Sequence, residues 1–314
     1  MDILKGLCIC LIVVGHCRIP EMGIRLIYLF HVPMFFFLSG LLHKDRRVAE
    51  ECKKSARALL LPYLLGVVFV GLKYLVDVLR GVDVSVVYRF LASALVVGPK
   101  VDFLGFTDLQ IGAIWFLPVL FICRVAFQAL ARLFKKKWML CAVLILVSFV
   151  GTLLLKDGPS VLGMGQGVAA MFFYSAGVAC RELETTPFAL KWKNVPFAFA
   201  LCFLSVFFCE SLDLHTLKFP VWWWSAFSTL AVILFLVKCA RLVEKNNGAV
   251  AALAFVGKNS ILLLLVHYFE MMTFDWSRIG CADSLLPLVR LAIDLVLFVA
   301  LLRIPVVKRL LRLS

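Results

Sequence analysis

Acidic residues, and charged residues in general, are scarce in this chain of 314 residues. Only 19 residues are Asp or Glu, and 17% of the sequence is charged, against about a quarter in an average soluble protein. Hydrophobic residues make up 63%, and the mean hydropathy is +1.01. A soluble protein with one large core does not account for apolar runs of about twenty residues that recur along the chain. The composition therefore predicts a polytopic membrane protein.

The sequence also lacks a CxxC pair or a Cys/His spacing typical of zinc, although it contains 11 cysteines. Most of them lie inside apolar runs, where cysteine behaves as a small hydrophobic residue: Cys8, Cys10, Cys123, Cys141, Cys202 and Cys239. We therefore expect no disulfide framework, no metal site and no bound cofactor. A small-x-small cleavage site is missing after the first apolar run, so we expect an uncleaved first helix.

Ten apolar spans can be placed along the sequence. We expect an all-α membrane helix bundle of about ten transmembrane helices, forming a single domain over residues 1–314. The longest connection, 80–111, contains an amphipathic stretch at Ser85–Val97 that is expected to lie in the membrane interface or to cap a cavity. The predicted spans are Ile3–Cys17, Ile24–Leu42, Ala58–Leu79, Gly112–Phe134, Trp138–Leu155, Val161–Cys180, Val195–Glu210, Val221–Cys239, Leu253–Met272 and Leu285–Val306.

The distribution of Lys and Arg predicts the orientation in the membrane. A formal net charge of +14 can indicate nucleic-acid binding, but here the basic residues lie in short loops between spans, as topology signals and lipid headgroup contacts do. One side of the predicted topology holds 21 of the 33 basic residues and the other side eight. By the positive-inside rule both termini are cytoplasmic. We expect a multi-pass protein of the cell (inner or plasma) membrane that contacts the lipid bilayer and does not bind nucleic acid.

Two histidines stand out in the first forty residues. Lys5 and His16 are eleven residues apart, about three helical turns, so they share one helix face with Ile9 and Ile12. The two ends of this face are roughly 16 Å apart along the helix axis. His31 lies in the next apolar span. An ionisable residue in such a span is costly and usually functional.

These stretches resemble the acyltransferase-3 family of membrane acyltransferases, particularly its fucose 4-O-acetylase-like branch. The matching motifs, in family order, are Asp2-x-x-Lys5-Gly6 with ten residues before His16, His31-x-Pro33-x-Phe35-Phe36-x-x-Ser39-Gly40, Lys53-Lys54-x-x-Arg57-x-Leu59-x-x-Pro62-Tyr63, Trp115-Phe116-Leu117 and Ser260…His267. One position departs from the pattern, because the wider family usually has arginine where Lys5 stands. Lysine keeps the charge and loses the bidentate fork.

The resemblance implies an enzyme that moves an acyl group, most simply acetyl, from acyl-CoA (acetyl-CoA) as co-substrate to a hydroxyl. The expected acceptor is an envelope sugar, polysaccharide or lipid-linked saccharide. The implied catalytic residues are His16, as general base, and His31. The implied CoA-binding residues are Lys5, Lys53, Lys54 and Arg57, and the implied acceptor-binding residues are Trp115 and His267. Direct transfer and a route through an acyl-histidine both remain open.

Simpler interpretations exist for each signal. A histidine near a helix end is often only interfacial, and a basic loop is often only a topology signal. The alternative function is a transporter or flippase of an envelope precursor, which would also carry buried charge. Short helices, a single basic loop and the lack of a repeated half argue against it. A membrane scaffold or sensor subunit would have no need for the histidine-bearing spans.

Several charges fall inside the predicted spans. Lys73 and Asp77, and likewise Arg290 and Asp294, are spaced i,i+4, so each pair is expected to neutralise itself on one helix. Arg124 has no such local partner. Two interpretations remain open: Arg124 binds a phosphate of the donor, or it pairs across the bundle with Asp294. Glu270 follows His267 by one turn and is expected to set its tautomer.

The orientation can be tested with reporter fusions. Fusions at Ser314 and in the 135–137 loop should report cytoplasm, and fusions near Pro99 or His215 should report the outside, because of the 21-to-8 division of basic residues. The reverse result at Ser314 and His215 would show that the predicted orientation is wrong.

Overall fold

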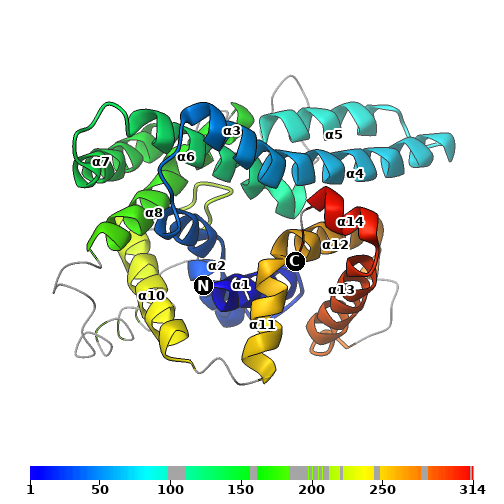
Figure 1. Ribbon diagram of the computed structural model, residues 1–314. Helices are drawn as coiled ribbons and strands as arrows, with labels where there is room; N and C mark the ends of the chain where they lie inside the picture. The colour runs from blue at the N-terminus through cyan, green and yellow to red at the C-terminus, as the bar shows by residue number, and fades with distance from the viewer. Residues whose placement is uncertain are drawn as a thin grey trace.

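The computed structural model describes residues 1–97, 111–155, 161–183, 212–219, 222–243, 248–276 and 282–311, with isolated positions at 197, 200, 204, 207 and 313. The secondary-structure elements in these ranges are helices (Figure 1). An isolated antiparallel β-bridge joins Asp213 to Lys218. The helices are α1 (Asp2–Gly15), α2 (Glu21–Leu41), α3 (Val48–Ser55), α4 (Leu61–Leu79), α5 (Ser85–Val96), α6 (Phe116–Leu130), α7 (Lys137–Leu155), α8 (Met164–Leu183), α10 (Trp222–Leu242), α11 (Gly248–Lys258), α12 (Ser260–Thr273), α13 (Leu286–Leu302) and α14 (Pro305–Leu311). Short π and 3-10 turns precede α4, α6 and α8 at Ala56–Leu60, Gly112–Trp115 and Val161–Gly163.

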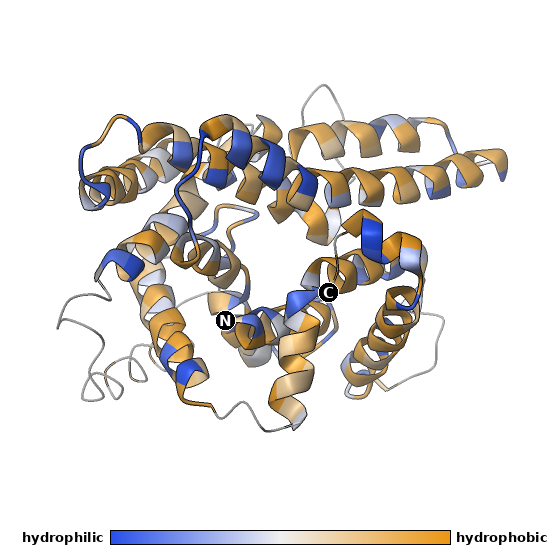
Figure 2. Cartoon of the chain, in the orientation of Figure 1, coloured by the Kyte–Doolittle hydropathy of each residue, from blue (hydrophilic) through white to orange (hydrophobic). Residues whose placement is uncertain are grey.

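The described helices have the apolar surface of a membrane protein. Five are long and apolar enough to cross a bilayer, or six if the bent pair α11–α12 counts as one span. Large hydrophobic side chains face outward, including Leu79 at 88% exposure and Leu154 at 76%, far more than a soluble surface carries. Figure 2 shows apolar residues along most helices and hydrophilic ones gathered on α3 and the loop before it. The expected count of ten spans is not confirmed, and the predicted span Val195–Glu210 lies outside the described residues except for four isolated positions.

Two predicted spans differ from the structure. The third begins earlier than Ala58, because α3, the π turn and α4 form one helical run over Val48–Leu79. The ninth, Leu253–Met272, is not one straight helix, because the chain bends by 75° between α11 and α12. Asn259 stands at this bend and is 1% exposed. The amphipathic stretch after residue 84 forms α5, which packs on α4, and its placement in the membrane interface or over a cavity stays a prediction.

Glycines bring two pairs of helices into backbone contact. A Cβ atom on Gly6 of α1 would lie 2.0 Å from the Leu253 carbonyl oxygen of α11, and one on Gly257 would lie 1.8 Å from the Asp2 carbonyl oxygen. Gly40 of α2 and Gly177 of α8 make an equivalent contact. In lipid, helices associate mainly through such close packing of small residues. The glycines of the Lys5-Gly6 and Ser39-Gly40 motifs therefore fix the positions of α1 and α2.

A proline in α2 is accommodated by a hydrogen bond from another helix. Pro33 has no N–H, so the Leu29 carbonyl four residues earlier has no partner within α2. The fully buried Thr229 of α10 donates its hydroxyl to this carbonyl at 2.8 Å. The bond satisfies a backbone acceptor that lipid could not satisfy, and it ties α10 to the part of α2 that carries His31.

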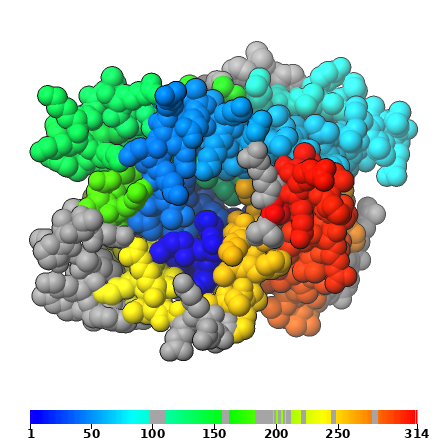
Figure 3. All heavy atoms as spheres, viewed as in Figure 1, coloured from blue at the N-terminus to red at the C-terminus, as the bar shows by residue number. Residues whose placement is uncertain are grey.

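The loop between α2 and α3 is held to the helices around it. Lys137, the first residue of α7, contacts Asp45 at 2.6 Å, and this hydrogen bond holds the pKa of the Asp45 carboxyl below its usual range. His43 is hydrogen-bonded to the Tyr174 hydroxyl of α8 at 2.9 Å. In the view of Figure 3, which is that of Figure 1, the molecular surface is hollowed between the N-terminal helices and α11.

The glycine contact can be tested by adding one methyl group. Gly257→Ala should lower the thermal unfolding midpoint in detergent, because overpacking a tight contact costs about 1–3 kcal/mol. Gly248→Ala, on the same helix, is the matched control, since a Cβ there meets no atom within 4 Å. Equal midpoints for the two variants would contradict the assigned role of the contact.

Candidate active site

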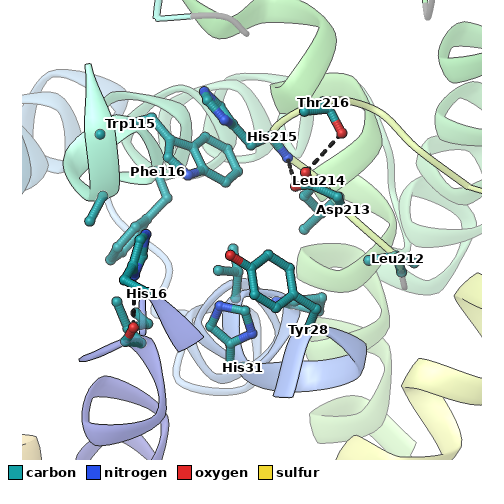
Figure 4. Close-up of a pocket in the computed structure, with 15 residues that line it drawn as sticks. His16, Tyr28, His31, Trp115, Phe116, Leu212, Asp213, Leu214, His215 and Thr216 are labelled. Carbon is teal, nitrogen blue, oxygen red and sulfur yellow. Dashed lines mark hydrogen bonds between the residues drawn. The ribbon is translucent and has the colours of Figure 1, made fainter. Parts of the chain in front are cut away.

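A cavity of about 240 Å³ lies where the end of α1, the middle of α2, the start of α6 and the segment 212–216 meet. His16, His31 and Trp115, three of the predicted site residues, line it together (Figure 4). We refer to it as the outer cavity, because the predicted topology places it toward the outside. The sequence separates these three residues by up to 99 positions, and the fold brings them to one site.

The tautomer of His16 follows from its hydrogen bond. His16 directly follows α1, and its Nδ1 lies 2.7 Å from the Ile12 carbonyl oxygen. A carbonyl only accepts, so Nδ1 carries the proton and Nε2 carries the free lone pair. The side chain is exposed to the cavity, and Figure 4 shows the ring at the cavity wall. His16 can therefore take a proton from a group bound in the cavity.

His31 is held in the same way one helix further on. Its Nδ1 lies 2.7 Å from the Ile27 carbonyl oxygen, which again leaves Nε2 with the lone pair. The residue is 5% exposed, and the Tyr28 ring packs edge-on against the imidazole with ring centroids 4.9 Å apart. Two imidazoles whose neutral forms have Nδ1 protonated and Nε2 unprotonated thus line one cavity.

His267 lies behind His16 and not among the residues that line the cavity. The two imidazole centroids are 5.2 Å apart, and His267 is fully buried. Its Nδ1 lies 3.0 Å from Asp294 Oδ2 and 3.3 Å from Glu270 Oε2. Asp294 is thus the nearer of the two carboxylates that can set its tautomer. The acceptor-binding role of His267 stays a prediction, and its position is that of a support for His16.

Arg290 completes this buried cluster and corrects the expected pairing on α13. The Arg290–Asp294 ion pair was predicted from i,i+4 spacing, and this prediction is wrong. Arg290 instead pairs with Glu270 of α12 at 2.8 Å and donates to the His16 backbone carbonyl at 3.0 Å. Lys73 and Asp77 do pair locally, at 2.7 Å. Arg290 therefore links the charged residues of α12 and α13 to the end of α1.

Three residues of the same cluster have possible ligand atoms close enough together to bind one metal ion. The ligand atoms of His267, Glu270 and Asp294 lie within 4.8 Å of one another. They are already hydrogen-bonded among themselves, and the Arg290 guanidinium faces the Glu270 carboxylate. This positive charge would repel a cation, so we interpret the cluster as an ion-pair network.

The segment 212–218 supplies residues that the sequence did not single out. Its His215 ring stacks on Trp115 with centroids 4.9 Å apart and an interplanar angle of 28°. The Asp213 carboxylate accepts hydrogen bonds from the His215 N–H and the Thr216 hydroxyl, each at 2.8 Å. Gln166 of α8 donates to the His215 carbonyl at 3.0 Å. An Asp and a His in a short connection form no recognisable spacing, so only the structure reveals this wall of the cavity.

A second cavity, of about 350 Å³, lies on the other side of Phe116. We call it the inner cavity. Four basic residues line it, Lys5, Arg57, Arg124 and Lys258, together with mainly apolar side chains of α1, α2, α6 and α12. Lys53 and Lys54, also predicted to bind the donor, are exposed on α3 and do not line it. The fold thus brings together two of the four predicted donor-site residues and adds two others.

Arg124 has a partner that the sequence did not indicate. The Glu51 carboxylate, 2% exposed, pairs with Arg124 at 2.7 Å and with Arg46 at 2.9 Å. Ser55 donates to the same carboxylate at 2.7 Å. A guanidinium held in this way is preorganised for an anion because little rotamer entropy remains to be lost. Glu51 lies 73 residues before Arg124, and no sequence pattern connects the two.

Comparison with known proteins identifies the family of the chain. A family model for the acyltransferase-3 domain, described as an acyltransferase domain, matches residues 1–305. No curated protein and no solved structure shows a significant match to the chain. An apolar helical chain with this domain is a membrane acyltransferase. The chain belongs to the acyltransferase-3 family, which confirms the enzyme class and does not favour the transporter alternative. The fucose 4-O-acetylase-like branch stays a prediction.

Proposed function

We propose that this enzyme transfers an acyl group, most simply acetyl, from cytoplasmic acyl-CoA to a hydroxyl of a cell-envelope sugar. The observation that carries the proposal is the pair of cavities on either side of Phe116. One is bordered by basic residues and the other by two imidazoles with free Nε2 atoms. An anionic donor and a neutral hydroxyl acceptor would occupy such sites respectively.

The inner cavity suits the donor. CoA carries phosphates at one end and a thin, largely neutral arm that ends in the thioester. Arg57 and Arg124 can bind phosphate through bidentate hydrogen bonds, and Lys5 and Lys258 can add point charges. Lys53 and Lys54 precede Arg57 by about one turn, where they would meet phosphates at the mouth of the cavity. The apolar walls between these charges would receive the arm.

The outer cavity suits a sugar hydroxyl. The stacked Trp115 and His215 rings offer an aromatic face, whose negative charge attracts the polarised C–H groups of a sugar ring. Asp213 and Thr216 of the facing wall offer hydrogen-bonding groups. A pocket with an aromatic surface and a few convergent polar groups is typical of a small-molecule site. We assign the acceptor ring to this surface, with its reacting hydroxyl toward His16.

The reaction then needs one base. The acceptor oxygen attacks the thioester carbonyl carbon, the new C–O bond forms, and the C–S bond breaks. The hydroxyl proton passes to His16 Nε2 and from there to the CoA thiolate, so no net proton is consumed. The network behind His16 holds the ring in place, because the His267 ring packs against it with centroids 5.2 Å apart and is itself hydrogen-bonded to Asp294. His31 would orient the acceptor hydroxyl through its own Nε2.

The central role of His16 predicts a loss of transfer with retention of the fold. In cells that lack the gene, the native enzyme should restore an added acyl mass on surface polysaccharide or lipid-linked sugar, measured by mass spectrometry. His16→Gln should lower transfer by about 10²–10⁴-fold, the range for a lost general acid–base residue. Wild-type transfer by a well-expressed His16→Gln protein would remove His16 from the mechanism. An unchanged envelope with the native enzyme would reject the proposed acceptor class.

The donor site predicts that a conservative change at Arg57 weakens acyl-CoA binding. Arg57→Lys keeps the charge and loses the bidentate geometry. A charge-assisted hydrogen bond contributes about 1.5–3 kcal/mol, so the KM for acetyl-CoA should rise about ten- to a hundredfold. Arg47→Lys is the matched control, because Arg47 is exposed in the same basic segment outside the inner cavity. Equal KM values for the two variants would mean that the basic segment only directs topology.

A further inference from the structure

Two helices run from the inner cavity to the outer one. On α1, Lys5 and Ile9 line the inner cavity, and Ile12 and His16 line the outer cavity. This is the face that the eleven-residue spacing of Lys5 and His16 predicts. On α2 the boundary falls between Phe35, which lines the inner cavity, and Pro33, which lines the outer one together with Val32.

Aromatic rings occupy the boundary. Of the described residues that line either cavity, Phe116 alone lines both. Its ring stacks on Phe35 with centroids 5.4 Å apart and an interplanar angle of 25°. Phe116 is 4% exposed. The neighbouring boundary residues Ile9, Ile12 and Val32 are also apolar, so this part of the boundary offers an arriving acyl group no hydrogen-bonding side chain.

Resting on the proposed function, we propose that the stacked Phe35–Phe116 pair is the gate between the donor and acceptor cavities and limits the length of the acyl group delivered to His16. The donor arm must displace the Phe116 ring to bring its thioester carbonyl into the outer cavity. The acyl group travels ahead of the thioester and must fit between the displaced ring and the small outer cavity. Phe35 holds the Phe116 ring in the closed position through the stacking contact. A short acyl group passes, and each added methylene meets the ring.

The gate is tested by acyl-chain selectivity. The full-length enzyme in nanodiscs is given acetyl-CoA or butyryl-CoA with an envelope fraction, and free CoA is measured by chromatography. Phe35→Ala and Phe116→Ala should raise the butyryl-to-acetyl ratio of kcat/KM by about tenfold or more, because one methylene in a fixed apolar site changes discrimination by about 10- to 200-fold. Phe35→Leu should have a smaller effect in the same direction.

The matched control for Phe35→Leu is Phe36→Leu. Phe36 is fully buried on the same helix and lines neither cavity. Its substitution should leave the ratio within about twofold of the native value, since a general loss of packing changes both donors alike. An unchanged ratio in folded Phe35→Ala and Phe116→Ala proteins overturns the gate, and so does an equal change in Phe36→Leu.

A second measurement separates failure of the gate from failure of the proposed function. The native enzyme and the variants are placed in proteoliposomes that contain a pH-sensitive dye, and proton entry is followed after an acid jump. If the rings divide the cavities, Phe35→Ala/Phe116→Ala should leak at least tenfold faster than the native protein and Phe36→Leu should not. If the native protein consumes no acyl-CoA, the proposed function fails, but the proton leak still tests whether the two rings separate the cavities. A double variant that admits protons no faster than the native protein overturns the gate.

Discussion

The backbone contact between α1 and α11 is the constraint on which both cavities depend. Gly6 and Gly257 let the two helices approach until a single Cβ atom would lie within 2.0 Å of a carbonyl oxygen. Lipid offers no hydrophobic drive for helix association, so a close fit of this kind holds helices together. Because α1 carries Lys5 at one end and His16 just beyond the other, one contact fixes the basic edge of the inner cavity and the imidazole of the outer cavity together.

The C-terminal end of α1 is held by charge as well as by packing. Arg290 donates to the His16 backbone carbonyl and is itself fixed by the Glu270 carboxylate. A helix end in an apolar environment needs partners for its last carbonyls, and here the partner comes from α13. The arrangement fixes the position of His16 without using its side chain, whose Nε2 stays open to the cavity. The backbone of His16 thus anchors the helix end, and its ring remains available to the cavity.

The sequence predicted features governed by local spacing and failed where partners come from distant helices. The 3.6-residue period predicts the shared face of Lys5 and His16, and i,i+4 spacing predicts the Lys73–Asp77 pair. Arg290 has the same spacing to Asp294, yet Glu270 of α12 offers its guanidinium a bidentate contact and Asp294 bonds to His267 instead. Such a competition is decided by helix packing, which no local pattern encodes.

Other differences had a partial signal or none. The bend after α11 coincides with a Gly257-Lys-Asn259 sequence whose glycine and asparagine are common at helix ends, so the sequence carried a partial signal for the bend. The Glu51–Arg124 pair and the Asp213–His215 wall of the outer cavity left no signal in the sequence.

The buried network of Arg290, Glu270, His267 and Asp294 also constrains how the chain is inserted into the membrane. Each of Arg290 and Asp294 adds about 2.5–3.5 kcal/mol to the insertion of an isolated helix, and α12 carries its own carboxylate. We expect α12 and α13 to leave the insertion machinery as a pair, so the contacts at the His16 end of α1 are completed only after α13 has been made.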